Sequence, residues 1–208
     1  MFVVLFEVQP RPERWSDYLE LAKFLKPKLE AIDGFIDNER FASQRAASQR
    51  NGGRLLSLST WRDEKSLVRW RTQGDHHGVP EKGRGGVFED YRLRVGEVTA
   101  DSAPPAGFVV AQQRFDETET GAAKIVTITE WTAPPDFAPN GCLEHEWFES
   151  IANTGKFLLL AGWRDAIAAQ TWTPPAGSRH RLVRVIRGYG MFDRREAPQY
   201  YPAPKPAP

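Results

Sequence analysis

Two segments of this chain repeat one another at a distance of about one hundred residues. Gly53–Asp63 reads GRLLSLSTWRD and Gly155–Asp165 reads GKFLLLAGWRD, so an apolar run, a tryptophan and an Arg-Asp pair recur in the same order. Such a repeat indicates two structural units in tandem. A second alignment of the halves follows the order of elements from Lys124 to Ile186 without using this match, and we favour it for topology. Either alignment predicts two α+β units rather than one large sheet.

The first half alternates strand and helix signals in a recognisable order. Short β-branched or alternating runs predict strands, and apolar residues at three- and four-residue spacing predict helices. The expected elements are a strand at Phe2–Val8, a helix at Glu13–Ile32, strands at Phe35–Phe41 and Arg54–Trp61, a helix at Glu64–Arg71 and a strand at Val87–Val98. This βαββαβ order is that of a ferredoxin-like unit.

The second half gives a less regular pattern. Its expected elements are strands at Phe108–Phe115 and Lys124–Trp131, a helix at Cys142–Asn153, an extended stretch at Phe157–Trp172 and a strand at His180–Ile186. A Pro- and Gly-containing linker follows the first unit, and prolines fill the C-terminal end. We therefore expect domains at 1–101 and 106–196 and a Pro-rich tail at 197–208.

Charge and cysteine content exclude several classes of protein. The formal net charge is +1, with 28 basic and 27 acidic residues, which gives no electrostatic footprint for nucleic acid. The single cysteine, Cys142, rules out an intrachain disulfide framework and a CxxC metal site. No apolar run is long enough to span a membrane. These features predict a cytoplasmic protein that binds a small molecule, with no metal.

The first hundred residues resemble the antibiotic biosynthesis monooxygenase (ABM) family of dimeric α/β-barrel proteins. The residues that carry the resemblance are Phe6–Val8, Tyr18–Ala22, Ile32–Ile36, Glu39–Phe41, Leu55–Ser59, Trp61–Glu64, Val68–Arg71, His76, His77, Gly83, Arg84 and Phe88–Val98. The resemblance implies a ferredoxin-like fold with a cavity between helices and sheet. The second half resembles a diverged member of the wider superfamily, so the two units are expected to pair as an intrachain pseudo-dimer. A further homodimer of the whole chain stays open.

Several residues of the first unit are candidates for the chemistry. His76 or His77 has the side chain to act as a general base, since an imidazole titrates near neutral pH; a loop histidine pair satisfied by solvent is the alternative. Arg40 is a candidate catalytic group that stabilises an enolate or phenolate, and Tyr91 is one that hydrogen-bonds a substrate hydroxyl. Candidate substrate-binding residues are Trp61, Trp70, Phe35, Asn38 and Arg54, although tryptophans more often belong to a core and arginines to surface ion pairs.

Haem is the alternative cofactor, with His76 or His77 as axial ligand. The haem-degrading members of the family carry an Asn in the first strand and a His about ten residues after the tryptophan that Trp61 resembles. Glu7 and Arg71 stand at these positions here, which argues against haem degradation.

The leading hypothesis is an ABM-like monooxygenase that needs no cofactor and acts on an aromatic or enolisable small molecule. A base forms a carbanion or phenolate, which reduces oxygen by one electron before the radicals recombine in a dry pocket. The alternatives are a haem-binding protein and a non-catalytic small-molecule-binding module.

Overall fold

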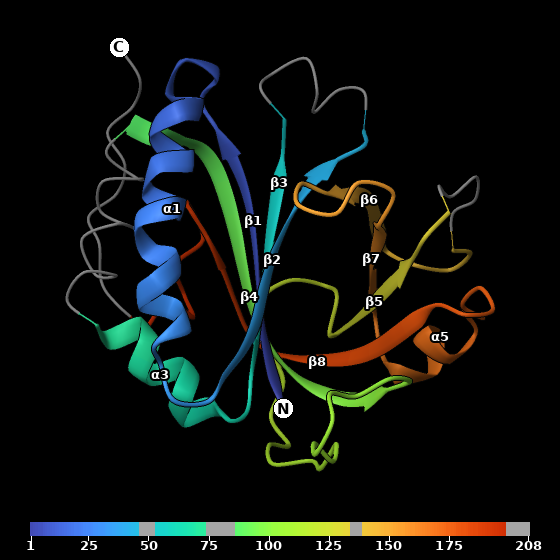
Figure 1. The fold of residues 1–208 in the computed structure, drawn as a ribbon. Coiled ribbons are helices and arrows are strands. Elements are labelled where there is room, and N and C mark those ends of the chain that lie inside the picture. Colours follow the sequence, from blue (N-terminus) through green and yellow to red (C-terminus); the bar gives the residue numbers. More distant parts are fainter. Residues whose placement is uncertain (46–52, 74–85, 134–138, 199–208) are drawn as a thin grey trace.

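The computed structural model describes residues 1–45, 53–73, 86–133 and 139–198. Within these ranges, eight antiparallel strands close into a barrel in the order β1-β3-β2-β6-β7-β5-β8-β4 (Figure 1). The strands are β1 (Phe2–Pro10), β2 (Phe35–Ser43), β3 (Leu55–Trp61), β4 (Phe88–Asp101), β5 (Ile125–Trp131), β6 (Glu144–Ser150), β7 (Phe157–Trp163) and β8 (Arg179–Gly190). The helices are η1 (Pro12–Arg14), α1 (Trp15–Glu30), α3 (Glu64–Thr72) and α5 (Ala166–Gln170).

Each half of the chain forms a four-stranded sheet with the same strand order. The first half gives β4-β1-β3-β2 and the second gives β8-β5-β7-β6. The sheets join at β2–β6 and β4–β8, so neither sheet has an open edge. The predicted fold class, α+β with two ferredoxin-like units in a dimeric α/β-barrel arrangement, is confirmed. The two halves share one closed sheet, and the division into domains at 1–101 and 106–196 stays a prediction.

The β2–β6 seam has a pseudo-two-fold arrangement of side chains. Glu39 lies opposite Leu58 on β3 and Glu146 lies opposite Leu160 on β7, which makes the two carboxylates equivalent. Each accepts hydrogen bonds from a serine and a cation of the other half. The contacts are Ser150 Oγ to Glu39 at 2.6 Å, Lys156 Nζ to Glu39, Ser43 Oγ to Glu146 at 2.5 Å, and Arg54 Nη1 to Glu146 at 3.4 Å.

The repeated segments occupy equivalent places in the two halves, which corrects the alignment that we favoured. Trp61 ends β3 opposite Phe2, and Trp163 ends β7 opposite Ile125. Asp63 caps α3 by accepting from the Ser66 amide, and Asp165 caps α5 by accepting from the Ala168 amide. The alignment of Gly53–Asp63 with Gly155–Asp165 is therefore the structural one.

The helix predicted at Cys142–Asn153 is wrong, because these residues contain strand β6. Burial alternates along β6, with Glu146, Phe148 and Ser150 buried and the residues between them more exposed. The adjacent aromatic residues Trp147 and Phe148 do not by themselves distinguish a helix from a strand. Pairing with β2 and β7 decides in favour of the strand. The second half thus has no described counterpart of α1.

Two other expectations in the second half are also wrong. The segment Phe108–Phe115 is not a strand, because the carboxylate of Glu97 accepts from the Gln113 and Arg114 amides in place of a neighbouring strand. The stretch Phe157–Trp172 is not extended throughout, since α5 begins after Asp165.

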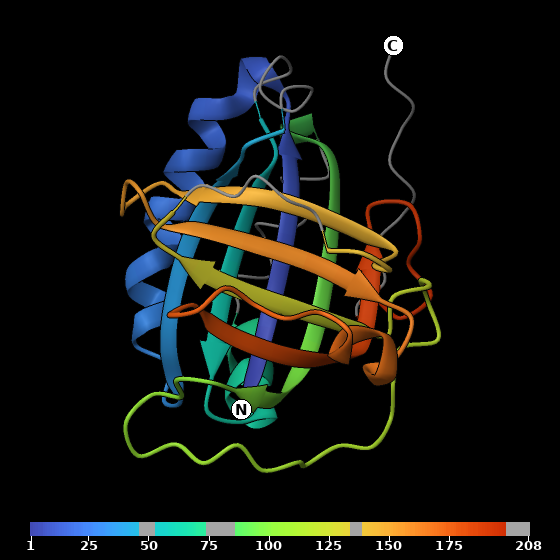
Figure 2. The same ribbon diagram turned by 90° about the vertical axis from the view of Figure 1, so that its right-hand side faces the viewer.

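Buried apolar side chains form separate clusters inside and outside the barrel. The interior is filled from all sides, with Val3, Leu56, Phe148, Leu158 and Val183 fully buried. α1 and α3 cover the outer face of the first sheet, while the short α5 is the helix that packs on the second within the described ranges (Figures 1 and 2). No helix in the described ranges is long and apolar enough to cross a membrane.

Candidate functional site

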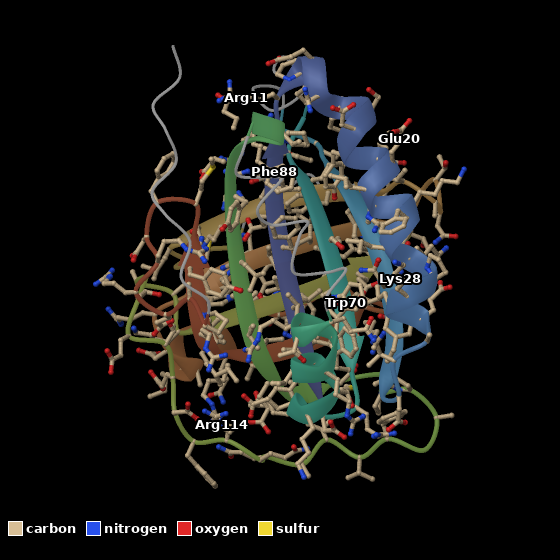
Figure 3. The ribbon with its side chains drawn as sticks, turned by 90° about the vertical axis from the view of Figure 1, so that its left-hand side faces the viewer. Arg11, Glu20, Lys28, Trp70, Phe88 and Arg114 are labelled. Carbon is tan, nitrogen blue, oxygen red and sulfur yellow. The ribbon has the colours of Figure 1, made fainter. Side chains whose placement is uncertain are left out.

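A cavity of about 180 Å³ lies between α1, α3 and the outer face of the first sheet. Trp70 on α3 and Phe88 on β4 lie toward different ends of this face (Figure 3). A buried water occupies roughly 10–15 Å³ by the same measure, so the space holds on the order of a dozen non-hydrogen atoms. The lining residues are Val4, Phe6, Tyr18, Leu21, Ala22, Leu25, Lys26, Leu29, Asn38, Arg40, Ser57, Ser59, Trp70, Arg71, Phe88, Tyr91, Leu93, Tyr189, Arg194 and Pro198.

Polar side chains gather on the β2–β3 side of the cavity floor. Asn38 Nδ2 donates to Ser57 Oγ at 3.0 Å and to the Leu58 carbonyl at 3.1 Å, which fixes the amide. Arg40 lies next to it and donates from Nη2 to the Ala22 carbonyl of α1 at 3.4 Å. Residues two apart on a strand face the same side, so Asn38 and Arg40 both reach the cavity.

The centre of the floor is apolar. Val4 and Phe6 lie on β1, in the middle of the sheet, and Leu93 follows on β4. The Phe6 ring lies 5.7 Å from the Tyr91 ring and 5.9 Å from the Phe88 ring, centroid to centroid. These aromatic contacts give the cavity a stiff, water-poor surface suited to a small apolar body.

The opposite edge of the cavity contains two phenols and an arginine. Arg194 Nη1 donates to Tyr91 Oη at 2.6 Å, and its guanidinium lies 5.0 Å from the centroid of the Tyr189 ring. Tyr189 and Arg194 come from the second half of the chain, on β8 and in the segment after it. This wall of the first unit's cavity is therefore built by the second unit.

Electrostatics distinguish the cavity from an ordinary core. Among the described residues, its lining includes the cations Lys26, Arg40, Arg71 and Arg194 and no Asp or Glu. Burial raises the pKa of Tyr18 above its ordinary value, although the nearby Arg40 guanidinium opposes the shift. Burial and the neighbouring Tyr91 raise the pKa of Tyr189 to about 12. The tyrosines thus face the cavity as neutral hydroxyls, and the fixed charge there is positive.

The structure brings together four of the residues selected from the sequence. Arg40, Asn38, Tyr91 and Trp70 all line the cavity. The sequence did not single out Tyr18, Tyr189, Arg194 or Arg71 as lining residues. Tyr18 carries a signal, because it lies on the apolar stripe of the helix, but Tyr189 and Arg194 lie about one hundred residues from the rest of the site and have none.

The other selected residues lie elsewhere. Trp61 is fully buried beside Phe35, with ring centroids 5.6 Å apart, and donates from Nε1 to Ser59 Oγ at 3.0 Å. Arg54 pairs with Glu146 in the β2–β6 seam. His76 and His77 lie outside the described residues, so their roles as base or haem ligand stay predictions. In the described ranges, no group of three or more His, Cys, Asp or Glu side chains is arranged to hold a metal ion.

The equivalent positions of the second half carry different side chains. Asn38 and Arg40 lie opposite Ser59 and Ser57, whereas the matching pairs on β6 and β7 are His145 with Ala161 and Trp147 with Leu159. Trp147 packs edge to face on Trp131 with centroids 4.8 Å apart. The polar floor of the first unit is thus replaced by packed apolar and aromatic side chains.

The sequence matches a family model and a curated relative, both named as monooxygenases. The family model for antibiotic biosynthesis monooxygenase matches residues 1–79. The chain belongs to the ABM family, because a relative with that domain matches almost its whole length. This relative is the jasmonate monooxygenase ABM of Pyricularia oryzae, 43% identical over 97% of this chain and 99% of its own.

Solved structures with related folds are more distant. An aldoxime dehydratase aligns with a TM-score of 0.55 at 12% identity, covering 88% of this chain and 81% of its own. An anthrone oxidase-like protein aligns with a TM-score of 0.37 at 12% identity, covering 91% of this chain and 92% of its own. The first of these supports the barrel fold and nothing about substrate.

Proposed function

We propose that this protein is a monooxygenase of a small, mostly apolar carboxylic acid with an enolisable carbonyl, of the jasmonate type. The observation that carries the proposal is the 43% identity over 97% of the chain to a jasmonate monooxygenase. Jasmonate is a cyclopentanone with a short hydrocarbon chain and a carboxylate. Its size and character suit a cavity of about 180 Å³ with an apolar floor and no acidic side chain among the described lining residues.

In the proposed reaction, the substrate itself supplies the electrons. A base removes a proton next to the carbonyl, and the enolate reduces O₂ by one electron before the radicals join to form a C–O bond. Return of the proton gives a hydroperoxide, so that R–H and O₂ become R–OOH without an outside reductant. Loss of water then leaves a ketone that holds one atom of the O₂. His76 or His77 is proposed as the base.

The cavity residues stabilise the negative charge that develops in this reaction. Tyr91, held by Arg194 at 2.6 Å, is placed to donate a hydrogen bond to an enolate oxygen. A donor oriented before the reaction needs no reorganisation when the charge forms, which is the main source of such stabilisation. Trp70 is proposed as a wall for the apolar body. Trp61, Phe35 and Arg54 lie away from the cavity, and this proposal gives them no substrate contact.

Haem is the competing occupant. The space among the described residues is far smaller than a haem macrocycle, which argues against haem in this cavity. A visible spectrum before and after addition of hemin tests this point directly. The proposal predicts a featureless spectrum, and a Soret band that is lost in His76→Ala or His77→Ala would replace it with haem chemistry.

The decisive test measures oxygen uptake with jasmonic acid. We expect O₂ and substrate to disappear together, and with ¹⁸O₂ one labelled atom to enter the product. His76→Ala combined with His77→Ala is expected to lower kcat by at least about 100-fold, the usual contribution of a general base. Binding of jasmonic acid without oxygen uptake would instead indicate a non-catalytic binding module.

A further inference from the structure

Arg40 has an unusual environment for an arginine. It lies on the floor of the cavity, and its Nε is buried without a hydrogen-bond partner among the described residues. Among the described residues, the hydrogen bond that its side chain forms is the long one to the Ala22 carbonyl, and the Tyr18 phenol lies close enough to feel its charge. No described carboxylate lies within ion-pair distance. A partly desolvated guanidinium with unused donors is costly unless an anion completes it.

The other cations of the lining are less suited to hold an anion in the cavity. Arg194 already donates to the Tyr91 hydroxyl and the Gly190 carbonyl. Lys26 lies on α1 with its Nζ 3.8 Å from the Glu30 carboxylate. Arg71 lies in the last turn of α3, at the rim rather than on the sheet. Arg40 is thus the cation that combines a floor position with free donors.

We propose that Arg40, together with the Tyr18 hydroxyl, binds the carboxylate of the substrate and so determines which way the substrate lies. The inference rests on the proposed function, since it names the end of the substrate that this site recognises. A planar guanidinium presents two parallel N–H groups that match both carboxylate oxygens, which gives orientation as well as affinity.

The sheet sets the distance between this anchor and the reactive end. Arg40 pairs with Ser57, Ser57 with Phe6, and Phe6 with Leu93 across β2, β3, β1 and β4. Three spacings of about 4.8 Å put the backbones of β2 and β4 roughly 14 Å apart. With the carboxylate on Arg40, the apolar body covers Phe6 and the carbonyl points toward Tyr91 and Arg194. Acids whose carbonyl lies several bonds from the carboxylate fit this span.

The test compares jasmonic acid with its methyl ester, which differs only in the charge and donor capacity of the anchored end. For the wild-type protein, KM for the acid is expected to be about 10- to 100-fold lower than for the ester, the range that a charge-assisted hydrogen-bond pair provides. Arg40→Met keeps the length of the side chain and removes the charge. It is expected to raise KM for the acid to the level of the ester, and to change the kinetics of the ester much less than those of the acid.

Further variants separate the anchor from a general effect. Arg69→Met, on the exposed side of α3 and outside the lining, is the matched control and is expected to keep the preference for the acid. Arg40→Lys is expected to keep only part of it, because an ammonium cannot bind both oxygens. Arg71→Met tests whether the cation at the rim of the cavity contributes to the preference for the acid. Loss of the preference in Arg71→Met, or equal losses for acid and ester in Arg40→Met, would overturn the proposal.

Binding without turnover keeps this inference separate from the proposed function. Quenching of tryptophan fluorescence by the acid and the ester is measured without oxygen. Tight binding of the acid that depends on Arg40, without turnover when oxygen is admitted, supports the anchor and refutes the monooxygenase reaction on this substrate. Turnover of acid and ester with equal KM supports the reaction and refutes the anchor, and binding of neither compound refutes both.

Discussion

At the scale of single residues, the cavity is defined by what each polar side chain is bonded to. Asn38 donates hydrogen bonds from its amide to Ser57 and to the Leu58 carbonyl, and Tyr91 accepts a hydrogen bond from Arg194. These contacts fix the groups in place before a ligand arrives. Arg40 differs, since among the described residues its guanidinium makes only a long hydrogen bond, to the Ala22 carbonyl, and no ion pair. The sequence does not show which of these polar side chains are held by hydrogen bonds to the protein and which are not.

The raised pKa of Tyr189 predicts a change in stability at alkaline pH. The folded-state pKa of about 12 exceeds the ordinary value of 10, so the folded protein keeps this proton while the unfolded chain loses it. Stability is therefore intact below pH 10 and falls as the pH rises toward 12, by about 1.4 kcal/mol at pH 11. Tyr189→Phe removes this contribution. Urea unfolding of the two proteins between pH 8 and pH 11 checks it, and parallel stability curves would refute it.

At the scale of elements, the segment that follows β8 completes the site. Glu196 holds it in place by accepting from Thr118 Oγ1 at 2.6 Å and from the Glu119 and Gly188 amides, each at 2.5 Å. Burial opposes ionisation, but these hydrogen bonds hold the pKa of Glu196 below its ordinary range. The carboxylate thereby positions Arg194, two residues earlier, over Tyr189 and Tyr91.

Loosening this segment is expected to slow catalysis of bound substrate more than it weakens binding, because Arg194 orients the Tyr91 hydroxyl that stabilises the enolate. Glu196→Gln removes the charge to which Thr118, Glu119, Thr120 and Gly188 donate hydrogen bonds, which costs roughly 1–3 kcal/mol of stability. We expect kcat with jasmonic acid to fall several-fold, with a smaller change in KM. The matched control is Asp193→Asn, since the Asp193 carboxylate pairs with the exposed Arg195. An equal fall of kcat in both variants would contradict the role of Glu196.

Strand β6 shows why one element was predicted as a helix. The run from Glu144 to Ser150 has two adjacent aromatic residues. This pattern does not distinguish the 3.6-residue period of a helix from the two-residue period of a strand. The structure resolves the ambiguity, because this segment forms ladders with β2 on one side and β7 on the other. The ladder with β2 joins residues over one hundred positions apart, so no local window contains it.

At the scale of the whole molecule, two units of one chain close the barrel together. The two halves keep the same strand order and an almost symmetrical seam around Glu39 and Glu146. They differ on their outer faces, where Arg40 in the first unit is replaced by Trp147 in the second. This asymmetry indicates that only the first unit keeps the residues of the proposed site.

A single site per chain is the resulting prediction. The positions equivalent to Asn38 and Arg40 lack the amide and the guanidinium, and Trp147 packs on Trp131 there. Isothermal titration calorimetry with jasmonic acid under anaerobic conditions is expected to give one ligand bound per chain. A stoichiometry near two would show that the second unit also binds the acid, and Arg40→Met would then remove only one of the two sites.

The sequence by itself determined the α+β class, the elements of the first unit, the family and four of the cavity residues. These follow from local signals, since period, capping by Asp63 and the order of elements are all contained in short stretches of chain. Only the tertiary structure decided that β6 is a strand and that Arg54 belongs to the seam. It also decided that Tyr189 and Arg194 close the cavity. The physical reason is the same each time: hydrogen-bond ladders and ion pairs between distant residues choose among conformations that local preference leaves close in free energy.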